Sequence, residues 1–311
     1  METNDTEIFS EALPDLTDWF QNSYFAVFTS SILMSVVLFP LYAYVFKMNR
    51  KHDQETLLFP AVNHFYQMTR NTYFIYLSFI CFFCLTFTHK HKGQYFNLAF
   101  PFLLYGLYTI AHVFSLLTFL LALQRLVLYF SPATEKYVIK VQKQMSKRFW
   151  ILYAICIIKD LVFVMATYKG YQKSFQITCL IFFIIFNMLS LLSALLHIPI
   201  YLSVKKLSYL ASAKSNTPQR FIIWQTATVV IFKCTYIPTF LAFLLGELSL
   251  LYLVLFSLSI DFFTTPLIVE LSYIGCNKRN MKTFFTAFSF RKFIRVLFDM
   301  KPKVSVEPQR F

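Results

Sequence analysis

Seven continuously apolar stretches divide this chain, and each is close to the length needed to cross a lipid bilayer. An apolar helix needs about 20 residues to cross the hydrocarbon core, which is roughly 30 Å thick. In lipid only helices and closed barrels satisfy every backbone polar group, and barrel strands alternate apolar and polar residues. The chain is therefore predicted to be all-α, with seven transmembrane helices at residues 24–46, 71–88, 98–123, 149–168, 176–202, 221–245 and 248–273.

Basic residues lie almost entirely in alternate connecting segments. The segments after the first, third, fifth and seventh stretches hold 23 Lys and Arg residues, whereas the three others hold 4. The leading segment has six acidic residues and no basic one. Because basic residues in short loops stay on the cytoplasmic side, the N-terminus is predicted outside and the C-terminus in the cytoplasm. Residues 1–23 then form an extracellular tail, 24–273 the bundle, and 274–311 a basic cytoplasmic tail.

Both predicted tails contain candidate modification or membrane-contact sites. The outer tail has the sequon Asn4-Asp5-Thr6, so Asn4 is a candidate for glycosylation. In the inner tail, apolar residues at helical spacing beside basic residues predict an interfacial helix over 280–298. Cys276, just inside the last apolar stretch, is a candidate for reversible palmitoylation.

Composition excludes several classes of protein. With 57% hydrophobic and 20% aromatic residues, the composition is not that of a soluble domain. The net charge of +14 is dispersed over the inner loops, which favours anionic inner-leaflet lipids and an acidic protein surface as partners and argues against nucleic acid. No nucleophile–base pair, phosphate-binding glycine loop or histidine cluster is evident, so we predict no enzymatic activity, catalytic residue, metal or cofactor.

Charged residues inside the apolar stretches are costly and usually mark a site or a pairing partner. Lys233 in the sixth stretch and Asp261 in the seventh lie at similar depth, which predicts an ion pair or a shared polar pocket. The pair is either structural or part of a switch. Lys159 and Asp160 are adjacent in the fourth stretch and point about 100° apart on a helix, so they are not expected to face one partner.

Aromatic and polar residues near this depth complete a candidate ligand pocket. Its predicted members are Tyr105, Tyr108, His112, Lys233, Tyr236 and Asp261. The aromatic members serve equally well as packing residues. The lysines inside the stretches slightly favour an acidic ligand.

Two sequence blocks beside the second and third stretches are distinctive. LFPAVNHFY at 58–66 leads into the second stretch, and LQRLVLYFSPATEKY at 123–137 follows the third. Together they resemble the serpentine receptor class Z family of nematode chemoreceptors. The resemblance implies a chemosensory G-protein-coupled receptor in the plasma membrane of a sensory neuron or its cilium. It also implies two partners, a small-molecule chemical cue and a heterotrimeric G protein.

Compared with rhodopsin-like receptors, several motif positions match in part. Arg125 resembles the arginine of the Asp/Glu-Arg-Tyr motif, but Gln124 and Leu126 replace its neighbours. Tyr236-Ile237-Pro238 resembles the aromatic-x-Pro step of helix 6, and Thr265-Pro266 resembles the Asn-Pro step of helix 7. The residues that the resemblance and their positions suggest for activation and G-protein coupling are Arg125, Tyr129, Pro238, Pro266 and Glu270. Arg125 and Glu270 are close enough in depth for a contact.

Three other classes of membrane protein are alternatives to a receptor. A small-solute transporter predicts an internal repeat and helices broken at small residues, and neither is evident. A ligand-gated channel of the insect olfactory type places its N-terminus inside, which the distribution of basic residues opposes. A structural or assembly protein of the membrane is harder to exclude from residues alone.

Overall fold

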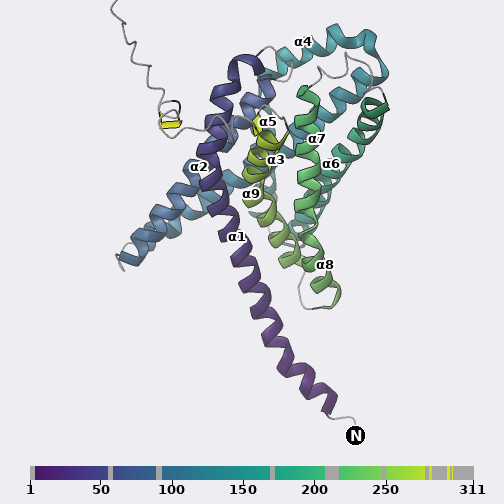
Figure 1. Ribbon diagram of the computed structural model, residues 1–311. Helices are drawn as coiled ribbons and strands as arrows, with labels where there is room; N and C mark the ends of the chain where they lie inside the picture. The colour runs from purple at the N-terminus through teal and green to yellow at the C-terminus, as the bar shows by residue number, and fades with distance from the viewer. Residues whose placement is uncertain are drawn as a thin grey trace, which may run out of the picture.

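The computed structural model is a bundle of long helices (Figure 1). It describes residues 4–54, 59–88, 93–168, 172–206, 217–246, 250–276, 280–281, 293–294 and 296. Over these ranges the chain is helical apart from short turns and contains no strand. The elements are α1 (Asn4–Asp53), α2 (Phe59–Thr88), α3 (Gly93–Phe130), the 3-10 turn η2 (Pro132–Thr134), α4 (Glu135–Ser146), α5 (Trp150–Tyr168), α6 (Gln172–Lys206), α7 (Thr217–Lys233), α8 (Tyr236–Leu244) and α9 (Leu250–Gly275).

The described residues of each predicted apolar stretch are helical apart from short turns, and the sixth stretch is divided between α7 and α8. Within the described residues, four helices are long and apolar enough to cross a membrane, and Leu180–Leu196 is a shorter apolar helix. The four are Tyr24–Asp53, Phe100–Phe130, Trp224–Leu244 and Tyr252–Gly275. The all-α class is confirmed for the described part of the chain.

The two predicted tails differ in how far the structure describes them. The segment predicted as an outer tail is helical from Asn4 onward. It is part of α1, which continues without a break into the first apolar stretch. Figure 1 shows this part of α1 projecting well beyond the other helices. Most of the interfacial helix predicted over 280–298 lies outside the described residues.

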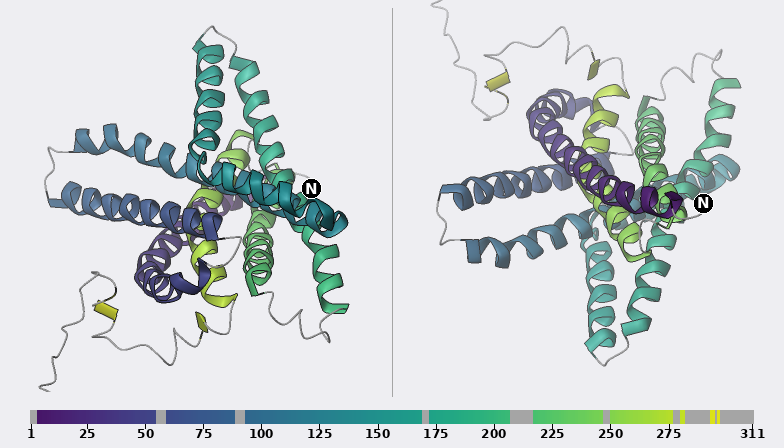
Figure 2. Two further views of the ribbon diagram at one scale, coloured as in Figure 1. Left: turned by 90° about the horizontal axis from the view of Figure 1, so that it is seen from above. Right: turned by 90° about the horizontal axis from the view of Figure 1, so that it is seen from below.

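Helices α3 and α9 form the centre of the bundle. α9 packs against α1, α2, α3, α6, α7 and α8, and α3 packs against α2, α5, α6, α7 and α9. Seen along the bundle, α2 with α3 and α5 with α6 leave this centre as antiparallel pairs (Figure 2). Any site between α3 and α9 is therefore enclosed by protein on several sides. We name the two ends of the bundle after α4 and α8, which lie at opposite ends (Figure 1).

Toward the α4 end, an aromatic cluster fixes α1 and α2 against α9. Phe46 stacks on Tyr66 with ring centroids 4.2 Å apart, and Tyr42 meets Tyr273 edge-on at 5.3 Å. The Tyr273 hydroxyl donates to Asp53 Oδ2 at 2.6 Å. Such aromatic pairs contribute about 0.5–1.5 kcal/mol each beyond their buried area. This cluster holds α9 to α1 and α2, whereas the side of α9 toward α7 carries Asp261, which accepts hydrogen bonds from Lys233.

Candidate functional site

A helix break between α7 and α8 positions Lys233. Pro238 is the third residue of α8 and has no backbone N–H. It therefore cannot donate the hydrogen bond that would continue the helix from α7. The Ile237 N–H bonds instead to the Cys234 carbonyl at 3.1 Å, which makes a turn. Lys233 is the last residue of α7, where the negative end of the helix dipole favours a positive charge.

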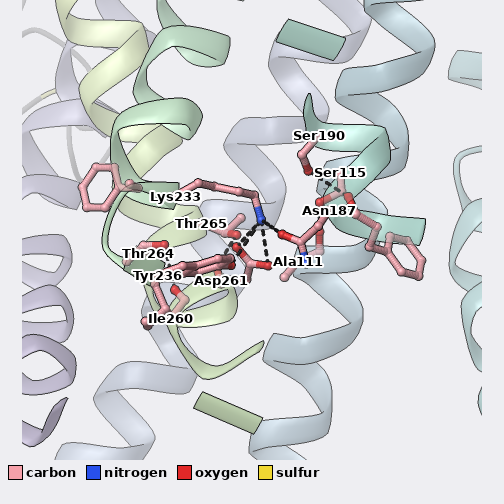
Figure 3. A network of polar contacts seen from close by, with 12 residues as sticks. Ala111, Ser115, Asn187, Ser190, Lys233, Tyr236, Ile260, Asp261, Thr264 and Thr265 are labelled. Carbon is pink, nitrogen blue, oxygen red and sulfur yellow. Dashed lines mark hydrogen bonds and ion pairs between the residues drawn. The ribbon is translucent and has the colours of Figure 1, made fainter. Parts of the chain in front are cut away.

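The Lys233 ammonium is the centre of a polar network (Figure 3). Its Nζ donates to Asp261 Oδ1 at 2.9 Å and Oδ2 at 3.1 Å, both from α9. It also donates to Asn187 Oδ1 of α6 at 2.7 Å and to the Tyr236 hydroxyl of α8 at 3.2 Å. The predicted pairing of Lys233 with Asp261 is thus confirmed, and the network joins four helices at the break.

Asn187 is the member of this network that the sequence analysis missed. Its amide nitrogen donates to the Phe183 carbonyl at 2.9 Å, which leaves its oxygen directed at Lys233. The only signal in the sequence is an amide side chain in the middle of the fifth apolar stretch. Because transmembrane helices often contain such polar residues as packing contacts, that signal does not identify a partner.

A second charged pair lies between α5 and α3. Lys159 Nζ is 2.8 Å from Asp160 Oδ1 and donates to the Tyr108 hydroxyl at 3.1 Å. The Tyr105 hydroxyl donates to Asp160 Oδ2 at 3.2 Å. The two adjacent charges contact different tyrosines, as expected, but both tyrosines lie on α3, one turn apart, and the charges also contact each other. Adjacent residues on a helix point about 100° apart. The lysine side chain is long and flexible enough to bend back to its neighbour.

Two cavities meet at Asp261. The first lies between α3, α6, α7 and α9 and is lined by seven serine and threonine residues as well as Lys233 and Asp261. Together with the open space at its mouth it has a volume of about 440 Å³, and we call it the hydroxyl cavity. The second has about 270 Å³, again including open space, and we call it the aromatic cavity. It is lined by Tyr108, Ala111, His112, Ser115, Phe186, Leu258, Asp261 and Phe262.

Four of the six predicted pocket residues line these cavities: Tyr108, His112, Lys233 and Asp261. Of the other two, Tyr236 contacts Lys233, whereas Tyr105 contacts Asp160 and lines neither cavity. The His112 ring packs edge-on against Tyr108 at 4.1 Å, with its Nδ1 3.0 Å from the Tyr108 carbonyl. The part of the chain that the structure describes has no group of three or more His, Cys, Asp or Glu residues that could hold a metal. The residues that line these cavities are the candidates for a ligand site.

Comparison with known proteins identifies the kind of protein that carries this site. A family model described as the serpentine type 7TM GPCR chemoreceptor Srz matches residues 25–278. The chain belongs to this family. The match includes every helix that lines the two cavities, and it confirms the resemblance drawn from the sequence blocks. Searches of curated proteins and of solved structures found no match.

Membership of the Srz family fixes the broad class of this protein. It is a membrane protein of a chemosensory receptor family, and that family is one of receptors rather than enzymes. The apolar helices of the described structure agree with this class.

The contact between Arg125 and Glu270 that their depth allows is not formed among the described residues. Glu270 is fully buried, and its Oε1 accepts a hydrogen bond at 3.0 Å from Ser35 of α1. Its Oε2 and the buried Arg125 Nε have no partner in the described part of the chain. Glu270 therefore faces α1 rather than α3, since similar depth does not place two residues on facing sides of their helices.

The remaining residues predicted for activation have distinct surroundings. Pro266 lies inside α9, and the Tyr76 hydroxyl of α2 donates to the nearby Phe263 carbonyl at 3.0 Å. Such bonds from a neighbouring helix stabilise the carbonyls beside a proline in lipid. Tyr129 is exposed near the end of α3 and packs edge-on against Phe130 at 5.1 Å.

Cys276 is a poor candidate for palmitoylation in this structure. It is buried, its thiol contacts the Tyr273 carbonyl at 3.2 Å, and the Asn280 amide lies 3.8 Å from its sulfur. Burial raises the pKa of the Cys276 thiol to about 12, and the thiolate is the nucleophilic form. The other candidate modification site is Asn4. It is the first residue of α1, and its side chain is not among those that the structure describes.

We expect Cys276 to resist S-acylation and thiol reagents in the folded receptor. With the five other cysteines replaced by alanine, maleimide labelling should be at least about tenfold slower at Cys276 than at a cysteine placed by Met281→Cys in a Cys276→Ser background. Met281 is a matched control because it lies close by and is partly exposed. Acyl-exchange labelling that disappears in Cys276→Ser alone would contradict this expectation.

Proposed function

We propose that this chain is a chemosensory G-protein-coupled receptor that binds a small-molecule cue at Asp261 and activates a heterotrimeric G protein. The observation that carries the proposal is the Lys233–Asp261 pair, which lines the hydroxyl cavity and links α7 to α9 at the break before α8. A ligand at this position competes with the contacts that hold α7 in place. Binding and helix movement are therefore coupled through the same atoms.

Coupling requires a difference in affinity. A ligand shifts a conformational equilibrium only when it binds one arrangement more tightly than the other. In the described arrangement Lys233 Nζ has four oxygen atoms within 3.2 Å. A ligand that takes Asp261 weakens the link between α7 and α9, and α7 then pivots at the turn at residues 234–235. The α4 end of α7 moves away from α3, which opens a crevice beside Arg125.

The α4 end suits the partner that this mechanism requires. In the proposed orientation the N-terminus is outside the plasma membrane of a sensory neuron or cilium, and α4 lies in the cytoplasm. The exposed residues of α4 and the turn after it include four basic side chains, Lys136, Lys140, Lys147 and Arg148. Exposed apolar side chains of Tyr137 and Val141 lie among them. This combination fits an acidic G-protein surface and anionic inner-leaflet lipids.

A G-protein activation assay on intact cells tests the proposal. The receptor carries an N-terminal epitope tag, and antibody labelling without permeabilisation measures both the amount at the surface and the orientation. A panel of small molecules should produce responses that are absent from cells lacking the receptor. Ligand-dependent uptake or current from tagged receptor, without G-protein activation, would overturn the proposal in favour of a transporter or a channel.

A further inference from the structure

The ion pair at the centre of the site does not itself select the charge of a ligand. Lys233 and Asp261 together carry no net charge, so a cation can take Asp261 and an anion can take Lys233. The polar atoms around the pair decide which exchange is favourable. Those atoms lie in the hydroxyl cavity and in the aromatic cavity.

The walls of the hydroxyl cavity present mainly hydrogen-bond acceptors. Four of its hydroxyl groups donate to backbone carbonyls of their own helices at 2.6–3.1 Å: Ser115, Ser190, Thr264 and Thr265. A hydroxyl that has donated its only proton retains its acceptor lone pairs. The cavity therefore suits a group that brings N–H or O–H donors, such as an ammonium group or water, and disfavours a carboxylate.

Two further hydroxyl groups in this cavity are buried without a partner. Thr118 and Thr226 are each 5% exposed, and neither Oγ1 has a hydrogen-bond partner among the described residues. Both residues line the hydroxyl cavity. Buried polar atoms are nearly always hydrogen-bonded, so these two mark places where a ligand or water completes the site.

The aromatic cavity offers a second means of holding a positive charge. The aromatic residues Tyr108, His112, Phe186 and Phe262 surround the approach to Asp261. Lys159 Nζ lies 5.2 Å from the Tyr108 centroid and 5.3 Å from the Phe186 centroid, so these rings are placed to contact an ammonium group. The charge of Lys159 is itself balanced by Asp160 at 2.8 Å. An ammonium group near aromatic faces gains about 0.5–2 kcal/mol. Aromatic rings beside a carboxylate form a site for an organic cation.

We infer that the cue is a small organic cation, of the class of protonated amines, whose charged group displaces Lys233 from Asp261. This inference deepens the proposed receptor function and rests on it. The lysines considered alone favour an acidic ligand. A carboxylate at Lys233, however, would lie beside the Asp261 carboxylate and the hydrogen-bond acceptors of the cavity wall, which are both unfavourable neighbours. After displacement Lys233 keeps Asn187 and Tyr236 as partners, so the exchange leaves neither charge without a hydrogen bond.

Thermal unfolding of the purified receptor in nanodiscs tests the charge of the ligand separately from signalling. The probes are 2-phenylethylamine, 2-phenylethanol and 3-phenylpropanoate, which share a ring and differ in the charge of the polar group. The amine should raise the unfolding temperature in a saturable manner, with little shift from the other two. A shift from the acid alone, or no shift from this amine and from hexylamine, would overturn the inference.

A hydroxyl variant keeps the test independent of folding defects. Thr226→Val preserves side-chain shape, removes one unpartnered hydroxyl of the cavity, and should require about tenfold more amine for the half-maximal shift. Thr239→Val is the matched control, because Thr239 is also buried with no hydrogen-bond partner for its hydroxyl among the described residues, but lines neither cavity. Equal weakening in both variants would contradict the site. Amine stabilisation without G-protein activation would instead refute the proposed function and leave the cation site intact.

Discussion

Removing either charge of the Lys233–Asp261 pair is expected to abolish ligand-dependent signalling and to lower the amount of receptor at the cell surface. The two side chains are 22% and 28% exposed, so the remaining charge stays partly buried between the helices. Loss of one partner of a fully buried pair typically costs about 3–5 kcal/mol, and a partly buried pair costs less. Even a part of that cost is significant against the roughly 5–15 kcal/mol that stabilises a folded domain. Surface labelling and G-protein activation of Lys233→Met and Asp261→Asn measure both effects.

The double variant separates a structural pair from a switch. Lys233→Met with Asp261→Asn leaves no unpaired charge, so we expect the surface amount to recover above either single variant while signalling remains absent. Lys159→Met with Asp160→Asn is the matched control, since that pair is also mostly buried and its Nζ and Oδ1 atoms are 2.8 Å apart. The control should still signal once surface amount is matched. A double variant of Lys233 and Asp261 that responds as the wild type does would show that the pair takes no part in switching.

The sequence predicted this pair because charge is rare and costly in lipid. When only a few charged residues lie inside seven apolar stretches, two of opposite sign at similar depth have few alternative partners. The same argument has no force for uncharged residues. Serine and threonine in membrane helices commonly bond to their own backbone. Nothing in the sequence therefore distinguishes Thr264, whose hydroxyl donates to the Ile260 carbonyl, from Thr226, whose hydroxyl has no partner within the described ranges.

Depth and angle along a helix do not fix contacts, as three further places in the structure illustrate. Glu270 matches Arg125 in depth but faces Ser35 of α1. Lys159 and Asp160 diverge at Cβ, yet their side chains meet. Cys276 lies at the end of the last apolar stretch, as a lipidated cysteine would, but the helix end around it is buried. Each of these depends on which neighbouring helix covers a face, which is a property of the packed bundle.

Replacing Arg125 by alanine is expected to reduce G-protein activation more than about tenfold while leaving ligand binding unchanged. Arg125 lies near the end of α3, and its neighbours Gln124 and Leu126 carry no acid to hold it. Its buried Nε has no partner in the described part of the chain. A guanidinium group is always charged and offers five donors, so it gains partners when α7 moves and a G protein enters. The assay compares activation at matched surface amount, with amine-induced stabilisation as the measure of binding.

Two further variants show whether Arg125 acts by its donors or by charge alone. Arg125→Lys keeps the charge but loses the planar set of donors, and should retain only part of the activation. Lys51→Ala removes a single exposed charge from the end of α1 and should have little effect, because an exposed charge contributes about 0–1 kcal/mol. If Arg125→Ala signals normally at matched surface amount, the crevice beside α3 is not where the G protein binds. Coupling must then occur elsewhere on the cytoplasmic face, and the partly matched arginine motif carries no functional meaning in this chain.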